Sequence, residues 1–295
     1  MDSNRLYSTE VFDTDVLRSP WAQLRETFRY TYLLRNLVQR DVKVRYKNSL
    51  LGVVWSLLNP LLMMMVYTVL FTILRPNNSI QYFHIFILVA LIPWQFLAGT
   101  VLGGTVSITQ NASLVKKVFF PRALLPTSVM FSQLINFILS FVVLVLLLYL
   151  SGIGLTRYVL WVPVILFTQM VFMLGLALAL AAAQTFYRDT LQIVQVAILA
   201  WFFLTPIFYP FEDFSQTAEM LGWSFNPARL MRWINPMASI VDSYRTVLWG
   251  TMESQGQPVS MDPLMLGRTF VTAVITLVIG YYLFIKTEHL FGEKL

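Results

Sequence analysis

The stretch RDVKVRYKNSLLGVVWSLLNP, residues 40–60, decides the fold of this chain. Its first half is dense in basic residues, namely Arg40, Lys43, Arg45 and Lys47. Its second half opens an apolar run that continues without a charge to about Leu74. About 20 apolar residues are enough to cross the hydrocarbon core of a bilayer, and basic residues directly before such a run favour the cytoplasmic side. The stretch therefore predicts the first membrane crossing and its direction.

The composition points to a membrane protein with a single polytopic domain. Of the 295 residues, 57% are hydrophobic and 12% are charged, whereas soluble domains have about 25% charged residues. The chain has no cysteine and only two histidines, His84 and His289, so we expect no thiolate chemistry and no metal site. We also expect no catalytic residue in this chain. The net charge of +6 fits cytoplasmic Lys and Arg facing anionic lipid, and we expect no nucleic-acid partner.

The N-terminal region divides into two parts. Residues 1–19 show no periodicity and predict a mobile cytoplasmic arm, whereas residues 20–50 predict an amphipathic helix in the membrane interface. Within it, Asn36, Arg40, Lys43 and Lys47 recur at spacings of four, three and four. This helix could serve only as a surface anchor. Alternatively, its cations could also bind a phosphate-bearing lipid headgroup, because ammonium and guanidinium groups make charge-assisted hydrogen bonds to phosphate.

Residues 51–295 predict one transmembrane domain with six helical spans. The five spans after the first are expected at about Ile85–Ser107, Val129–Leu150, Val159–Phe186, Leu191–Tyr209 and Thr269–Ile285. With both termini inside, 15 of the 21 Lys and Arg residues lie on the cytoplasmic side, as the positive-inside rule requires. The fourth span is rich in Gly and Ala around Gly175, which predicts a close helix–helix contact.

The segment between the fifth and sixth spans predicts a re-entrant helical hairpin on the outer side. Residues Ile234–Gly250 carry apolar side chains at helical spacing, but they are too few to cross the bilayer. An Asn-Pro pair stands at Asn235, and a similar pair stands nine residues earlier. Two short helices folded against each other fit this pattern.

The spans contain essentially no charged residue, which argues against proton-driven or sodium-driven carriers and against channels with a charged ring. Their polar residues are mostly amides, interleaved with aromatic rings: Asn59, Gln95, Gln133, Asn136, Gln169, Gln192 and Gln195. Amides and rings together suit a sugar-contacting surface, although ordinary interhelical hydrogen bonding is the better explanation for any single one of these residues. No glycine precedes a lysine, so the chain has no P-loop. Energy for active transport would have to come from another polypeptide.

Residues 110–126, QNASLVKKVFFPRALLP, form the cytoplasmic connection between the second and third spans. Two prolines break the segment, and paired aromatic residues stand beside three cations. The composition fits a docking site for a partner protein. It fits equally well a membrane-hugging loop whose lysines extend toward the headgroups.

Several motifs resemble ABC-2 type permeases, above all the subunits that export lipid-linked polysaccharides such as O-antigen, capsule and teichoic acid. The start of the first span reads R-D-x-K-x-R-Y-K-x-S-x-x-G-x-x-W-x-x-x-x-P, and residues 111–126 resemble the family's coupling-helix region. Further similar positions follow in order: Arg188-Asp189, Thr205–Pro210, Asn235–Met237, Tyr244-Arg245, Gly250, Glu288 and Phe291. The resemblance covers about Leu33 to the C terminus. The N-terminal arm and the segment Glu212–Arg232 are longer than usual.

The resemblance implies an ABC exporter subunit in the bacterial plasma membrane. It implies a homodimer with both termini in the cytoplasm, bound to two copies of a separate ATPase that holds ATP and Mg²⁺, with no cofactor in this chain. The substrate headgroup would meet Arg40, Lys43, Arg45, Tyr46 and Lys47. A glycan channel around the first, second and fifth spans would be lined by Trp55, Asn59, Trp94, Gln95, Gln192 and Gln195. The coupling residues would be Lys116, Lys117, Phe119, Phe120 and Arg122, and the outer gate would be Asn235, Tyr244 and Arg245.

Two other functions remain open at this stage. The same architecture could export a small lipid or a drug. A membrane-embedded enzyme that modifies glycans would need clustered carboxylates, and the acidic residues Asp41, Asp189, Glu212, Asp213 and Asp242 do not group on one side by sequence.

Overall fold

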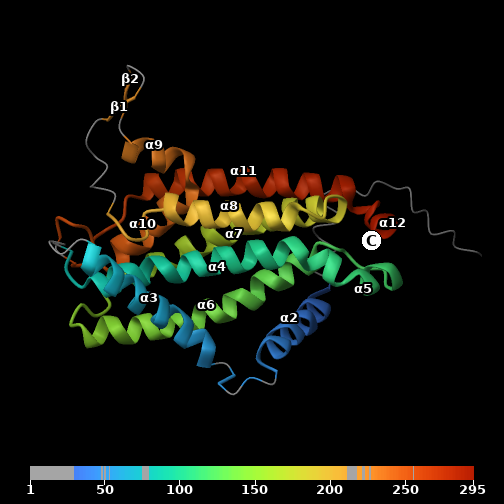
Figure 1. The fold of residues 1–295 in the computed structure, drawn as a ribbon, viewed down its shortest axis with the longest axis horizontal. Helices are drawn as coiled ribbons and strands as arrows, with labels where there is room; N and C mark the ends of the chain where they lie inside the picture. The colour runs from blue at the N-terminus through green and yellow to red at the C-terminus, as the bar shows by residue number, and fades with distance from the viewer. Residues whose placement is uncertain are drawn as a thin grey trace, which may run out of the picture.

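The protein is a helical bundle in the computed structural model (Figure 1), which describes residues 30–47, 49, 51–52, 54–74, 80–210, 218–220, 223–225, 227–254 and 256–295. The predicted arm, residues 1–19, lies outside the described residues, and the predicted interface helix is described from Tyr30 onward. The long helices are α2 (Thr31–Tyr46), α3 (Val54–Leu74), α4 (Phe83–Gln110), α6 (Leu124–Leu150), α7 (Val162–Phe186), α8 (Thr190–Leu204) and α11 (Pro263–Glu288). The shorter elements are α5 (Ala112–Lys117), η2 (Arg157–Trp161), α9 (Pro227–Ile234), α10 (Pro236–Leu248) and α12 (Phe291–Lys294).

Most of the apolar helices are long enough to cross a membrane. Among the described residues, five qualify by length and composition: α3, α4, α6, η2 with α7, and α11. The predicted class, an all-α polytopic membrane protein, is confirmed. The count of six crossings stays a prediction, because α8 has 15 residues and covers about 22 Å at 1.5 Å per residue, less than the hydrocarbon thickness of about 30 Å.

The expected fifth span, Leu191–Tyr209, is helical only to Leu204. Thr205 has an extended backbone with φ −96° and ψ 136°. Because the ring of the following proline disfavours the helical conformation in the residue before it, Pro206 explains where the helix ends. Helix α8 nevertheless packs against α4 and α7 in the bundle.

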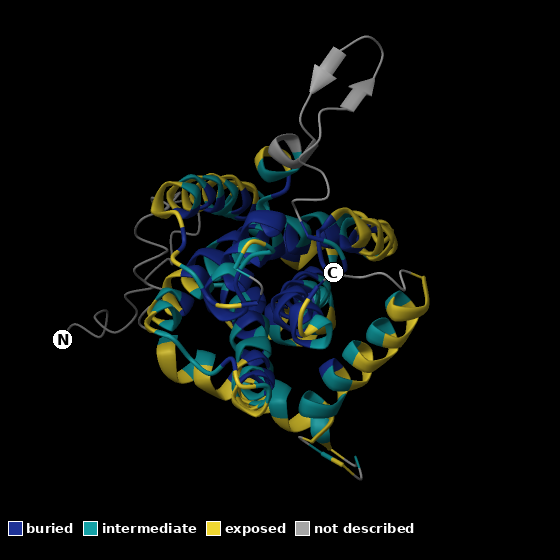
Figure 2. Ribbon diagram, turned by 90° about the vertical axis from the view of Figure 1, so that its left-hand side faces the viewer, coloured by how far each residue is buried: buried dark blue, intermediate teal, exposed yellow. Residues whose placement is uncertain are grey.

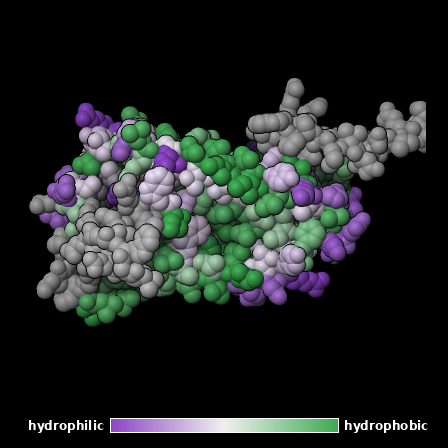
Figure 3. Space-filling model, turned by 90° about the horizontal axis from the view of Figure 1, so that it is seen from above, coloured by the Kyte–Doolittle hydropathy of each residue, from purple (hydrophilic) through white to green (hydrophobic). Residues whose placement is uncertain are grey.

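Helix α4 forms the centre of the bundle. Every residue from Ile85 to Trp94 is buried, and α4 contacts α3, α6, α7, α8 and α10. Figure 2 shows the buried helices in the middle and helices with exposed outer faces around them. Helix α3 is the opposite case, because only Pro60 of its 21 residues is buried. Apolar side chains fill the middle of the face seen in Figure 3, and hydrophilic ones gather toward both ends.

Helices α7 and α11 approach each other most closely. A Cβ atom built on Gly175 would lie 2.6 Å from the backbone of Leu277, and one on Gly280 would collide with the carbonyl oxygen of Gly175. Small residues permit this approach, and in a bilayer such packing is a main source of helix association. The close contact that the sequence predicts for the Gly- and Ala-rich span is confirmed.

The segment before α11 contains the two expected short helices. Helix α9 leads through Asn235 into α10, and α10 is buried along most of its length against α4, α7 and α11. Figure 1 shows α10 inside the bundle, at the end where α4 begins. A feature that was not predicted precedes α9: strands β1 (Ala218–Met220) and β2 (Trp223–Phe225) pair antiparallel, with Ala218 opposite Phe225.

We expect Gly280→Ala to destabilise the folded protein by about 1–3 kcal/mol, because the added methyl group must push α11 away from α7. Gly267 lies on the same helix with nothing within 4 Å of a built Cβ, so Gly267→Ala is the matched control. Detergent unfolding of the purified variants measures both changes. Equal stability of the two variants would contradict the close contact.

Candidate functional site

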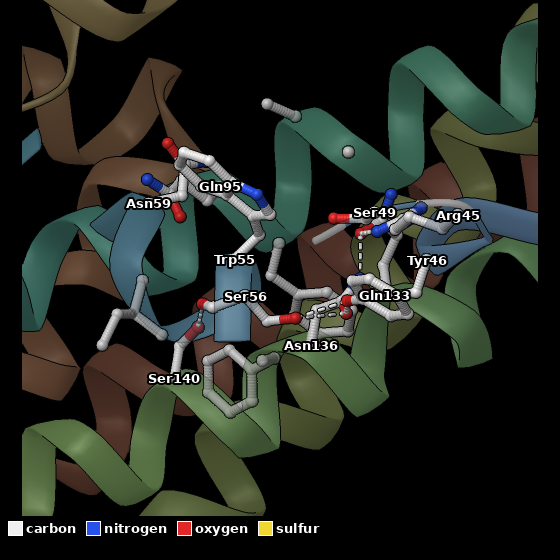
Figure 4. A pocket seen from close by; sticks show the side chains of 15 residues that line it. Arg45, Tyr46, Ser49, Trp55, Ser56, Asn59, Gln95, Gln133, Asn136 and Ser140 are labelled. Carbon is white, nitrogen blue, oxygen red and sulfur yellow. Dashed lines mark hydrogen bonds between the residues drawn. The ribbon is translucent and has the colours of Figure 1, made fainter. Parts of the chain in front are cut away.

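A cavity of about 480 Å³ opens where α2, α3, α4 and α6 meet. Figure 4 shows its polar and aromatic lining converging from these helices and the loop after α2. The lining consists of Arg45, Tyr46, Ser49, Trp55, Ser56, Asn59, Gln95, Phe96, Gln133, Asn136, Phe137 and Ser140. The turn between α2 and α3 brings the first of these side chains toward the bundle. Gly52 has φ +49° there, a conformation that glycine adopts without strain, and its N–H donates to Ser49 Oγ at 3.1 Å.

Arg45 lies at the rim of the cavity and binds α6. Its Nη1 donates to Gln133 Oε1 at 2.9 Å, and Asn136 Nδ2 donates to the same oxygen at 3.1 Å. Gly99 on α4 makes room for this arrangement, because a Cβ atom there would lie 2.7 Å from Gln133 Nε2. The absence of one side chain on α4 thus allows the amide of Gln133 to reach the guanidinium of Arg45.

Tyr46 forms the second link across the cavity wall. Its hydroxyl donates to Asn136 Oδ1 and is hydrogen-bonded to Ser56 Oγ. Ser140 Oγ also donates to the main-chain oxygen of Ser56 at 2.9 Å. These bonds join α2, α3 and α6, so the cavity wall is fixed by its own polar groups.

The lining combines one cation with amides, hydroxyls and an exposed ring. Arg45 can bind an anionic group such as a phosphate through charge-assisted hydrogen bonds. Asn59 and Gln95 offer both donors and acceptors, and Trp55, with 47% of its surface exposed, offers a flat apolar face. Such a site suits a ligand with an anionic group next to several hydroxyl groups.

Comparison with known proteins decides the family. Residues 32–249 match the family described as ABC-2 type transporter. The chain belongs to this family. It is 38% identical over 226 residues to the O-antigen export system permease protein RfbA of Myxococcus xanthus, over 77% of this chain and 84% of the relative. It is also 30% identical over 268 residues to the protein of the same name in Klebsiella pneumoniae, over 89% of this chain and 95% of the relative.

The ABC-2 family membership sets the general role of the chain. It is a multi-pass membrane permease, a component separate from the ATPase subunit with which such permeases work. The cavity and α5 lie inside the matched residues 32–249, whereas α11 and α12 follow them.

The permease brings two of its predicted site groups together in the cavity. Arg45 and Tyr46, expected to meet the headgroup, line the same space as Trp55, Asn59 and Gln95, expected to line the channel. The other expected headgroup residues stay outside the cavity. Lys43 and Lys47 are exposed, and Arg40 forms an ion pair with Asp41 at 2.9 Å.

Three of the expected channel residues lie elsewhere in the permease. Trp94 is only 5% exposed and packs in the core. The centroid of its ring lies 6.0 Å from that of Trp201 and 5.5 Å from that of Phe202. Gln192 and Gln195 lie on the exposed face of α8. Within one copy of the chain these three residues do not line the cavity.

The expected coupling residues separate into two groups. Lys116, Lys117 and Phe119 are exposed, Phe119 by 84%. Phe120 is only 5% exposed and belongs to a buried cluster at the α5 end of the bundle, and the backbone N–H of Arg122 donates to Glu288 Oε1 at 3.0 Å. The first group is available to a partner, whereas the second holds the permease itself together.

Asn235, one of the expected gate residues, caps α10. Its Oδ1 accepts the backbone N–H of Ala238 at 3.2 Å and the indole N–H of Trp201 at 2.8 Å. Its Nδ2 donates to Thr205 Oγ1 at 3.2 Å. Asn235 therefore fixes the start of α10 against the end of α8.

Tyr244 and Arg245 anchor α10 in the core. The Tyr244 hydroxyl donates to Gln169 Oε1 at 3.2 Å, and burial raises the pKa of Tyr244 well above its usual value, so the hydroxyl keeps its proton. Arg245, only 3% exposed, donates to the main-chain oxygen of Ile207 at 2.6 Å, and its guanidinium carbon lies 3.6 Å from the Phe86 ring centroid. All three expected gate residues hold α10 in place.

Five polar lining residues were not assigned to the predicted headgroup or channel sites: Ser49, Ser56, Gln133, Asn136 and Ser140. Gln133 and Asn136 were noted only among the amides of the spans. Gln133, Asn136 and Ser140 are spaced by three and four residues, which puts them on one face of a helix. A polar stripe on an otherwise apolar span was the signal that could have identified them. No such spacing marks Ser49 and Ser56.

We expect Tyr46→Phe to lower the stability of the permease by about 1 kcal/mol, because Asn136 and Ser56 lose a partner inside the bundle. Tyr32 lies on the same helix and is 78% exposed, so Tyr32→Phe should change stability by less than about 0.5 kcal/mol. Detergent unfolding compares the two variants. A Tyr46→Phe protein as stable as the Tyr32→Phe protein would show that the hydroxyl bonds do not hold the wall.

Proposed function

We propose that this chain is the permease subunit of an ABC exporter that moves a lipid-linked polysaccharide of the O-antigen type. The movement runs from the cytoplasmic to the outer face of the bacterial plasma membrane. The names of the relatives in Myxococcus xanthus and Klebsiella pneumoniae support the substrate class. The cavity between α2, α3, α4 and α6 is the observation that carries the proposal, because its lining suits a phosphate joined to a sugar.

In this proposal the cavity receives the headgroup before transport. The exposed cations Lys43 and Lys47, together with Arg40, attract the anionic group to the membrane surface. Arg45 at the rim then binds phosphate oxygens, and Trp55 stacks on the first sugar while Asn59 and Gln95 hydrogen-bond its hydroxyls. The lipid tail stays in the bilayer beside the exposed face of α3.

The proposed orientation has both termini in the cytoplasm. Helices α5 and α12 lie at the same end of the bundle in Figure 1, and they carry Lys116, Lys117 and Lys294. Lys286 lies in the last turn of α11, next to α12. Basic residues gathered at one end favour the cytoplasmic side for that end.

A homodimer is part of the proposal. Helix α3 exposes apolar residues along most of its length, and the amides of Asn59, Gln192 and Gln195 are exposed on α3 and α8. Amides facing lipid are unfavourable. A second copy that covers these faces would enclose the amides in a shared polar channel, where they could bind the glycan.

Two copies of a separate ATPase complete the proposed exporter. Each would bind ATP and Mg²⁺ and would dock on the exposed side chains Lys116, Lys117 and Phe119. At the other end, the hairpin of α9 and α10 would form the exit, with Asn235, Tyr244 and Arg245 fixing its position relative to α4 and α8.

We expect Arg45→Ala to lower export of lipid-linked glycan by about tenfold, since it removes charge-assisted bonds worth about 1.5–3 kcal/mol. Arg35 is exposed on the same helix and does not line the cavity, so Arg35→Ala is the control. Surface glycan on cells and glycan retained inside them are measured together. Normal surface display by the Arg45→Ala variant would rule out the headgroup role.

We expect the triple variant Lys116→Ala, Lys117→Ala, Phe119→Ala to weaken ATPase binding by about 2 kcal/mol or more, as for central interface residues. Lys286→Ala, which removes an exposed cation beside the same end of the bundle, should leave binding unchanged. Co-purification of the ATPase with the tagged permease provides the measurement. Unchanged co-purification of the triple variant would reject docking at α5.

A further inference from the structure

We propose that Glu288 and Phe291 lock the α5–α6 connection to the C-terminal end of α11. Force applied to α5 by the ATPase then reaches α11 and α7 as well as α4 and α6. The inference rests on the proposed function, because it takes α5 as the place where the ATPase docks. Glu288 and Phe291 are positioning residues, and they lie outside the residues proposed to touch the ATPase.

This lock, formed by Arg122, Glu288 and Phe291, joins two distant parts of the chain. Arg122, just before α6, meets Glu288, the last residue of α11, across 166 residues of sequence. Helix α12 lies next to α5 in Figure 1 and contacts it. The segment proposed to receive the ATPase is therefore packed directly against the C-terminal end of the chain.

Arg122 and Glu288 each cap a helix end. Glu288 caps the start of α6, which follows Arg122, and Arg122 caps the end of α11, where Glu288 lies. The Glu288 carboxylate accepts the backbone N–H of Arg122 at 3.0 Å. It thereby places a negative charge at the N-terminus of α6, where the N-cap residue is Ala123 and its side chain cannot accept a hydrogen bond. In return, the Arg122 guanidinium donates to the main-chain oxygen of Glu288, in the last turn of α11.

This exchange explains why a carboxylate stands at this position. The first N–H groups and the last carbonyl groups of a helix lack partners within it. Negative charge stabilises a helix N-terminus, and positive charge stabilises a C-terminus. Glu288 and Arg122 satisfy both requirements at once, so separating α6 from α11 would expose two helix ends.

Phe291 contributes the apolar contacts of the lock. It is fully buried, with ring centroids 5.2 Å from Phe284 on α11 and 6.2 Å from Phe186 at the end of α7. The guanidinium carbon of Arg122 lies 5.9 Å from its ring centroid. One ring thus contacts the ends of α7 and α11 and the residue that leads into α6.

The close contact of α7 and α11 at Gly175 and Gly280 extends this unit into the membrane. A displacement of α5 cannot leave α11 behind without breaking the Arg122–Glu288 bonds, and α11 cannot leave α7 without opening the glycine contact. The exposed side chains of Lys116, Lys117 and Phe119 stay outside the lock. Loss of the lock should therefore leave ATPase binding intact and reduce the coupling of hydrolysis to transport.

The test uses the complete complex of permease and ATPase in vesicles that contain the lipid-linked glycan. We expect Glu288→Ala to lower the amount of glycan exported per ATP hydrolysed by about fivefold or more, the range of typical coupling effects. ATPase co-purification should stay within about twofold of the unmodified complex. Glu288→Gln keeps an oxygen that can accept the Arg122 N–H but loses the negative charge at the N-terminus of α6, so it should retain more coupling than Glu288→Ala.

Glu293 supplies the matched control, because it is an exposed carboxylate five residues further along the chain. Glu293→Ala should leave export per ATP unchanged, whereas Phe291→Ala should lower it as Glu288→Ala does. Normal coupling in the Glu288→Ala complex would overturn the lock. Absence of glycan export by the unmodified complex would instead contradict the proposed function.

A distance measurement tests the lock if Glu288→Ala fails to fold. The chain has no cysteine, so spin labels can be attached at Ser113→Cys on α5 and Glu293→Cys on α12, both exposed positions. Labelled permease is diluted with unlabelled permease, so that distances within one chain dominate. The lock predicts the same distance with and without bound ATP, and a shift between the two states would overturn it.

Discussion

A charge-free central helix is the constraint on which the rest of the structure depends. Helix α4 has no Asp, Glu, Lys or Arg in its 28 residues, and in a bilayer its polar groups must find partners inside the protein. Several do so locally, as in the bond from Thr105 Oγ1 to the main-chain oxygen of Val101 at 2.7 Å, or through a neighbour, as in the bond from Gln169 Nε2 to the main-chain oxygen of Pro93, also at 2.7 Å. Five other helices can then pack around α4, and the buried Arg245 of α10 meets α4 only near its first turn, at Phe86.

Because the central helix carries no charge, the charged side chains that make hydrogen bonds lie at the ends and the edge of the bundle. One end has the exchange between Arg122 and Glu288, and the opposite end has Arg245, which is stabilised by main-chain oxygens and the Phe86 ring. The cavity around Arg45 lies at the edge, where α2 and α3 join the bundle. A bundle built in this way can bind and guide a substrate, but the middle of its membrane-spanning helices offers no charged group that an ion gradient could drive.

The sequence predicted the helices well because the length of an apolar run and the Pro, Gly and Asn residues at its ends are enough to locate a helix. It predicted α10 between Asn235 and Gly250, but it started the third span at Val129, whereas α6 begins at Leu124. The reason is that Pro126 lies in the first turn of α6, where a missing N–H costs nothing. The site was only partly predicted. Spans that are apolar on every face do not reveal which side meets a neighbour, so nothing in the sequence put Trp94 in the core or Gln195 on the surface.

The account holds that this permease moves its cargo only when a separate ATPase drives it. The most direct measurement is transfer of lipid-linked glycan across vesicles that contain the permease alone or the permease with its ATPase. We predict transfer against a gradient only when both the ATPase and ATP are present. Uphill transfer by the permease alone would contradict the account.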